Sequence, residues 1–183
     1  MLVFLDFEAS SLSKHSYPIE IAWVFEDGTA KSYLIKPKPG WTDWSEKAEM
    51  IHGLSREQLE REGVDISTIV EEMMATLVNA DLLASAPSWD GKWLSTLLRA
   101  GGQPRHVLRL RKTDEALKEV AKSICADISE QDLGVLVDQV IRETAPAAPA
   151  HRALPDAILE RERWLAVRQR ARSWKSGAES SGT

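Results

Sequence analysis

The first eight residues constrain the fold more than any other stretch of the chain. Met1 to Leu5 form an uninterrupted apolar run, which is typical of a strand that is buried on both faces of a sheet. Asp6 and Glu8 follow directly. Because successive side chains of a strand point to opposite faces, these two acids project from the same face. They also lie at the carboxyl end of the strand, where open α/β sheets bind their ligands.

Two carboxylates beside an apolar core are unfavourable, because they repel each other and lose hydration. A bound cation offsets this repulsion, and hard oxygen ligands suit Mg²⁺ or Mn²⁺. The pattern Asp-x-Glu is common, and on its own it favours a salt-bridged strand end. The rest of the sequence therefore has to decide between a metal site and a structural ion pair.

Composition indicates one domain in a reducing compartment. The 183 residues are 43% apolar, which suffices for one substantial core. The net charge of −5 argues against a protein that holds long nucleic acid by bulk charge, so a polyanionic substrate would be held locally or by metal ions. Cys125 is the only cysteine, which excludes an intramolecular disulfide and a cysteine zinc cluster. Since no leader or bilayer-spanning run is recognisable, we expect a cytoplasmic protein without membrane attachment.

The order of the apolar segments predicts a mixed α/β sheet with helices on its faces. The predicted strands cover residues 1–8, 19–25, 31–35, 82–86 and 107–110, and the first three form an antiparallel meander. The predicted longer helices cover residues 65–79, 89–99, 114–126, 129–143 and 154–174. We expect a single domain over residues 1–175 and a disordered tail, rich in Ser and Gly, over residues 176–183.

Two further acids lie near the starts of predicted helices. Asp90 follows the fourth strand, where a helix N-cap is the simplest role. Asp156 follows Pro155 in the first turn of the last helix, whose positive end favours an ionised carboxylate. His151 follows the proline-rich loop 145–150, and an exposed loop histidine is its simplest interpretation.

Together these positions closely resemble the DEDDh 3′→5′ exonucleases, which include proofreading exonuclease subunits and oligoribonuclease. The three motifs of that family correspond to Asp6-Phe7-Glu8, to Asp90, and to His151-x-Ala153-x-x-Asp156. The segment Ile51-His52-Gly53 is a secondary match. The resemblance extends from the first strand to the last helix. It implies a ribonuclease-H-like fold, with a five-stranded mixed sheet in which parallel strands follow the three-stranded meander.

The resemblance also implies a two-metal hydrolysis of phosphodiester bonds. Asp6, Glu8, Asp90 and Asp156 would hold two divalent ions, Mg²⁺ or Mn²⁺, and His151 would be the general base. The substrate would be the 3′ end of single-stranded DNA or RNA, or a short oligonucleotide, and the product a nucleoside 5′-monophosphate. DNA versus RNA, substrate length, and monomer versus homodimer stay open.

We also expect contacts to the terminal nucleotide from Ser10, Leu12 and His52, with packing as the alternative for Leu12, and base stacking on Trp89, with Trp41 or Trp44 as further candidates. The sequence departs from the family pattern at three places: Ala9-Ser10 follows the first motif where threonine is usual, Ala86 replaces the usual asparagine of the second motif, and no acidic-threonine pair follows the fifth strand. A nucleic-acid-binding module of the same fold, with weak or no turnover, is therefore the alternative.

The last predicted helix is rich in arginine. A solvated face is the simplest interpretation, and a stripe that follows a nucleic-acid backbone is the alternative. The cations concerned are Arg161, Arg163, Arg168, Arg170, Arg172 and Lys175.

Overall fold

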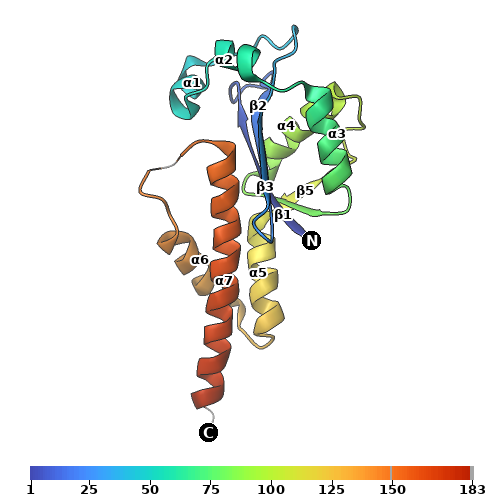
Figure 1. The fold of residues 1–183 in the computed structure, drawn as a ribbon. Helices are drawn as coiled ribbons and strands as arrows, with labels where there is room; N and C mark the ends of the chain where they lie inside the picture. Colours follow the sequence, from blue (N-terminus) through green and yellow to red (C-terminus); the bar gives the residue numbers. More distant parts are fainter. Residues whose placement is uncertain (149, 182–183) are drawn as a thin grey trace.

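A five-stranded mixed sheet forms the centre of the molecule (Figure 1). The structure is a computed structural model that describes residues 1–148 and 150–181. The strands are β1 (Leu2–Ala9), β2 (Pro18–Phe25), β3 (Ala30–Leu34), β4 (Asp81–Ala84) and β5 (Leu110–Lys112), in the order β3-β2-β1-β4-β5. The first three pair as an antiparallel meander, whereas β4 is parallel to β1 and β5 is parallel to β4. The predicted mixed sheet is confirmed.

Helices cover both faces of the sheet. They are α1 (Glu46–His52), α2 (Arg56–Glu62), α3 (Ile66–Leu77), α4 (Pro87–Ala100), α5 (Thr113–Ile124), α6 (Glu130–Glu143) and α7 (Ala153–Ser181). Figure 1 shows α3 and α4 on one face and α5 and α7 on the other, with α6 against α7 and with α1 and α2 beyond the carboxyl end of β1. In the described part of the chain, no helix is both long and apolar enough to cross a bilayer.

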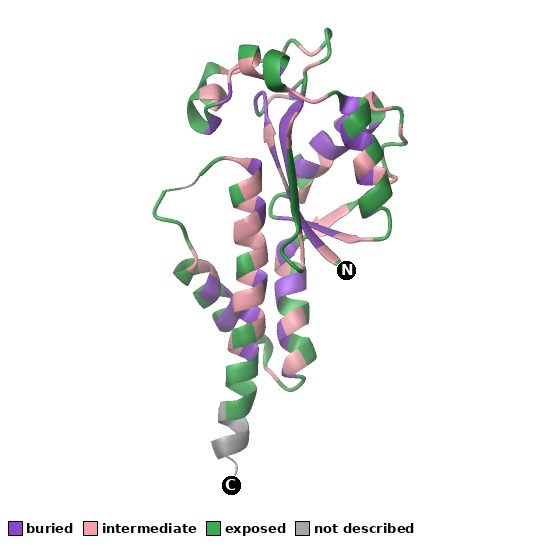
Figure 2. Ribbon diagram, in the orientation of Figure 1, coloured by how far each residue is buried: buried purple, intermediate pink, exposed green. Residues whose placement is uncertain are grey.

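The side chains of β1 alternate between the two faces, as the first strand predicted. Its odd-numbered core residues pack with α3 and α4; they are Val3, Leu5 and Phe7. Phe4 points the other way, into the core under α7, where its ring lies 6.2 Å from that of Trp164. Figure 2 shows buried residues along β1 and β2 and along the inner sides of the helices. Since Asp6 and Glu8 share the parity of Phe4, they lie on the face that α7 covers.

Two segments differ from the sequence predictions. β5 begins at Leu110, because the Val107 N–H donates to the Pro104 carbonyl (3.1 Å) and so closes a turn before the strand. α7 extends to Ser181, past the end of the helix predicted over residues 154–174, since each added residue extends an existing hydrogen-bonded helix. The predicted disorder of the tail stays a prediction. Residues 182–183 lie outside the described residues.

Both outer strands of the sheet are short and carry cations. On β3, Lys31 forms an ion pair with Glu72 (2.9 Å). On β5, which has three residues, Arg111 forms ion pairs with Asp81 (2.6 Å) and Glu119 (2.8 Å). These pairs connect each outer strand to its neighbouring elements.

Candidate functional site

Three carboxylates converge where β1 ends and α7 begins. Asp6 and Glu8 on β1 and Asp156 in the first turn of α7 each offer one oxygen, and these atoms lie within 4.8 Å of one another. The convergence follows from the fold, because α7 crosses the face of β1 to which both strand acids point. Among the described residues, no other group of three such side chains comes this close together.

Asp90 lies beside this group without being part of it. It is buried, with 2% of its surface exposed, and it is the fourth residue of α4. Its Oδ2 accepts a hydrogen bond from the Ala86 N–H (3.3 Å), so the carboxylate reaches back over the start of the helix. The charge of Asp90 raises the pKa of Asp6, which indicates that the two acids are near each other.

Burial raises the pKa of all four acids, and repulsion from other acids of the group adds to the effect for Asp6 and Glu8. The pKa of Asp6 is raised well above its ordinary value, chiefly by burial and then by the charges of Asp90 and Glu8. Burial, followed by the charge of Asp156, raises the pKa of Glu8 to about 7. Burial also raises the pKa of Asp90 to about 7 and raises that of Asp156.

The donor set fits a divalent cation. All the converging ligand atoms are carboxylate oxygens, which Mg²⁺ and Mn²⁺ prefer. The ion pairs of residues 1–148 and 150–181 include none to Asp6, Glu8, Asp90 or Asp156, so the salt-bridged strand end that the sequence left open is not formed. A cation would relieve both the repulsion and the desolvation that raise these pKa values.

An ion pair between the buried Glu20 and the partly exposed Arg152 docks the start of α7 onto β2. Glu20 lies directly opposite Glu8 in the β1–β2 pairing. Its carboxylate accepts hydrogen bonds from Arg152 Nε (2.9 Å), Arg152 Nη2 (2.7 Å) and the Ala153 N–H (3.0 Å). This role was not predicted, although an acid within the apolar stretch Ile19–Phe25 is visible in the sequence. The pair holds Arg152 and Ala153, which lie inside the His151–Asp156 motif, in place.

His151 lies on the exposed loop immediately before α7. Its φ of 47° makes it the only residue other than glycine with a positive φ in the described part of the chain. The charge of His151 lowers the pKa of Asp156, in opposition to burial. The imidazole is therefore close to the carboxylate group and open to solvent.

The serine loop after β1 is held together by internal hydrogen bonds. Ser10 is fully buried, and its Oγ accepts from the Tyr17 N–H (3.1 Å). Asp43, which sequence analysis did not single out, accepts hydrogen bonds from the hydroxyls of Ser11 and Ser13. Leu12 is 72% exposed at the tip of this loop. The structure thus uses the Ser10 hydroxyl within the loop and leaves Leu12 accessible.

The other two predicted contact residues differ in exposure. Trp89 is 37% exposed and stacks on Trp93, with 5.7 Å between ring centroids. His52 is buried, and burial lowers its pKa. Its Nδ1 accepts from the Leu54 N–H (3.0 Å), whereas its Nε2 has no hydrogen-bond partner among the described residues. His52 therefore keeps one buried polar atom available.

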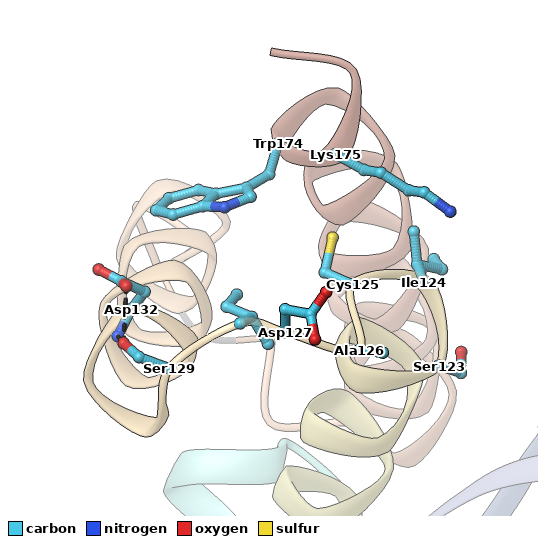
Figure 3. Close-up of a pocket in the computed structure, with 10 residues that line it drawn as sticks. Ser123, Ile124, Cys125, Ala126, Asp127, Ser129, Asp132, Trp174 and Lys175 are labelled. Atoms are coloured by element: carbon cyan, nitrogen blue, oxygen red, sulfur yellow. Dashed lines mark hydrogen bonds between the residues drawn. The ribbon is translucent and has the colours of Figure 1, made fainter. Parts of the chain in front are cut away.

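A cavity away from the carboxylate group lies near the far end of α7. It has a volume of about 610 Å³ and is lined by the α5–α6 connection and the distal part of α7. Figure 3 shows Trp174 and Lys175 on α7 across from Cys125 and Asp132. Trp174 lies eighteen positions after Asp156 on α7, or roughly 27 Å along the helix axis. This cavity is therefore separate from the carboxylate group.

Solved structures of exonuclease I share the fold. The zinc-bound complex of *E. coli* exonuclease I with single-stranded DNA matches with a TM-score of 0.66 and 14% identity, over 92% of this chain and 40% of that chain. A moderately thermophilic exonuclease I from *Methylocaldum szegediense* matches with a TM-score of 0.62 and 13% identity, over 92% and 40%. A product-bound exonuclease I matches with a TM-score of 0.64 and 11% identity, over 94% and 45%.

This chain spans about two fifths of the length of those proteins. No protein-family model matches the sequence. No curated protein matches it either. The structural likeness confirms the predicted ribonuclease-H-like fold.

Asp6→Asn should change how stability depends on pH. The pKa values of Asp6, Glu8 and Asp90 are raised in the folded protein, whereas in the unfolded chain these groups have the ordinary pKa values of 3.8 for Asp and 4.5 for Glu. Above those ordinary values, the folded protein therefore keeps protons that the unfolded chain loses. Stability should therefore fall as pH rises from those values to about 7 and above. In chelator, the melting temperature of the wild type should fall more between about pH 5 and about pH 8 than that of the variant.

At the higher pH, Mg²⁺ or Mn²⁺ should raise the melting temperature of the wild type and have little effect on Asp6→Asn, since a ligand of the folded state stabilises it by mass action. Scanning fluorimetry measures both effects. A metal-free variant that melts many degrees below the wild type would show that Asp6 is structural.

Glu20→Gln should lower the free energy of unfolding by about 1–3 kcal/mol, because it weakens charge-assisted hydrogen bonds at a buried position. Urea unfolding measures the loss. Glu26→Gln is a matched control, since Glu26 also pairs with α7, through Arg168 at 3.8 Å, but both side chains are well exposed. Its effect should stay within about 0.5 kcal/mol. Equal losses in the two variants would contradict the docking role of Glu20.

Proposed function

We propose that this chain is a metal-dependent 3′→5′ exonuclease that acts on single-stranded DNA or RNA or on short oligonucleotides. The observation that carries the proposal is the convergence of Asp6, Glu8 and Asp156, unpaired and with raised pKa values, on a fold shared with exonuclease I. Structures of the *E. coli* enzyme with single-stranded DNA and with a dT13 oligonucleotide support this substrate class.

Asp6, Glu8 and Asp156 would hold the divalent ions, with Asp90 alongside. When bound, two such ions supply charge neutralisation at the phosphate and the leaving oxygen. The raised pKa values also mean that protons compete with cations for these oxygens near neutral pH.

His151 would accept the proton of the attacking water. In the reaction the water oxygen bonds to phosphorus, the bond from phosphorus to the 3′ oxygen breaks, and that oxygen takes up a proton. The product is a nucleoside 5′-monophosphate. The exposed position of His151 beside Asp156 suits a group that must exchange protons with solvent. The ion pair between Glu20 and Arg152 would keep this motif in register with β1.

The terminal nucleotides would bind between the serine loop and α1. The buried Nε2 of His52 is a polar atom for the substrate, because Nδ1 is already an acceptor. Leu12 and Trp89 offer apolar surfaces on which bases can pack.

A nucleic-acid-binding module of the same fold is the second candidate. Asp90 lies outside the converging group, and Ala86, which replaces the usual asparagine, contributes only its backbone N–H to that carboxylate. The two candidates differ in turnover, which makes them separable by one assay.

The wild-type protein should shorten 5′-labelled oligonucleotides from the 3′ end in single-nucleotide steps, in Mg²⁺ or Mn²⁺. Chelator should abolish the reaction, because the carboxylates then lack their cations. Denaturing gels of labelled DNA and RNA of several lengths provide the measurement. Binding of all substrates without shortening, in both metals, would instead establish the binding module.

His151→Ala should lower turnover by about 10²–10⁴ with metal binding retained, the usual effect of removing a positioned general base. His151→Asn is the matched variant, since asparagine tolerates a positive φ but cannot act as this base. At metal concentrations that saturate the carboxylates throughout, wild-type turnover should rise as pH increases through neutrality, because a general base must be unprotonated, and this rise should flatten in both variants. Near wild-type turnover with an unchanged pH profile would rule out this role.

A further inference from the structure

A groove with basic walls begins next to the candidate site. It has a volume of about 340 Å³ and lies between α4 and the segment that leads into β5. Its polar lining consists of Ser95, Arg105, His106 and Arg109, and no acidic side chain lines it in the described part of the chain. This is unusual for a chain whose net charge is −5.

The cations of the groove are free to bind an anion. Among residues 1–148 and 150–181, the side chains of Arg105, His106 and Arg109 take part in no hydrogen bond or ion pair. Arginines of α7 behave differently. Arg161 donates a hydrogen bond to the Glu26 carbonyl. Three others form ion pairs: Arg163 with Glu160, Arg168 with Glu26 and Arg170 with Glu143. The α7 stripe is therefore largely used to hold the fold together.

One end of the groove lies one residue from Asp90 along α4. Gly91 lines it and directly follows Asp90, so their Cα atoms are about 3.8 Å apart. A Cβ atom at Gly91 would meet nothing within 4 Å, so the glycine leaves this end of the groove open. A strand with its 3′ end at Asp6 could thus continue along α4 toward Arg105 and Arg109.

We propose that this groove binds the phosphate backbone of the nucleic-acid strand on the 5′ side of the terminal nucleotide. The proposal rests on the exonuclease function proposed above and adds to it a second, metal-independent binding region. Guanidinium groups bind phosphate oxygens by paired, charge-assisted hydrogen bonds. A local basic groove also explains how an acidic protein holds a polyanion.

The test compares binding in chelator, where no hydrolysis occurs. An oligothymidylate of about ten nucleotides with a 5′ fluorescent label is titrated with wild type and with Arg105→Gln/Arg109→Gln, and fluorescence anisotropy is recorded at several salt concentrations. The double variant should bind roughly tenfold more weakly at low salt. Its log–log salt slope should shrink by about 0.7 for each lost phosphate contact.

Two sets of controls make the result specific. Lys118→Gln/Arg172→Gln removes two exposed cations that lie on α5 and α7, and it should bind like the wild type. Gly91→Glu should weaken binding because it places a carboxylate in the groove, whereas Gly91→Ala should leave binding unchanged. Both variants should fold, because a Cβ atom at this position meets nothing within 4 Å and because Glu and Ala are better helix formers than Gly.

Equal weakening in the two double variants, or unchanged binding in Arg105→Gln/Arg109→Gln and Gly91→Glu, would overturn the proposal.

Hydrolysis of a dinucleotide tests the exonuclease function separately from the groove, because a dinucleotide is too short to occupy the groove. Dinucleotide turnover should be the same in wild type and in the groove variant. If the wild type hydrolyses neither the oligothymidylate nor the dinucleotide, that result would refute only the exonuclease proposal. Weaker binding by the groove variant would support the groove in that case too.

Discussion

The candidate site depends on the alternation of side chains along β1. One face of the strand supplies the core under α3 and α4. The other begins with Phe4 against Trp164 and ends with Asp6 and Glu8, so the same face changes from apolar to acidic within a few residues. α7 must match both parts. It does so with Trp164 over the apolar part and Asp156 over the acidic part.

Two acids that face each other across β1 and β2 have opposite environments. Glu20 accepts hydrogen bonds from a guanidinium and a backbone N–H, and it fixes the start of α7. Glu8 has no ion-pair partner in the described part of the chain, and its pKa is raised to about 7. A carboxylate satisfied by the protein serves the fold, whereas one left unsatisfied is available to a ligand. The structure therefore separates structural from functional acids within one pair of strands.

Local patterns in the sequence were sufficient to predict the sheet, and they placed Asp6 and Glu8 on one face of β1 and Asp156 in the first turn of the last helix. That Asp156 would join the two strand acids was implied by the resemblance of the three motifs to an exonuclease family, and not by any local pattern. The contact between Glu20 and Arg152 joins residues 132 positions apart, and although an acid within an apolar strand is visible in the sequence, its partner is not. The same holds for the groove, which depends on a turn at Val107 that also displaces β5. Long-range packing, which a single sequence does not reveal, decided these features.

The outer strands of the sheet also have a consequence for contacts between molecules. An unpaired strand edge is a template for β-pairing with another chain, and short length and charge are the usual defences. β5 has three residues, with Arg111 and Lys112 among them, and Lys31 lies on β3. A second copy that added its own strand to either edge would bring its chain beside these cations and their partners Glu72, Asp81 and Asp114. Short length and charge therefore disfavour continuation of the sheet from one molecule into the next.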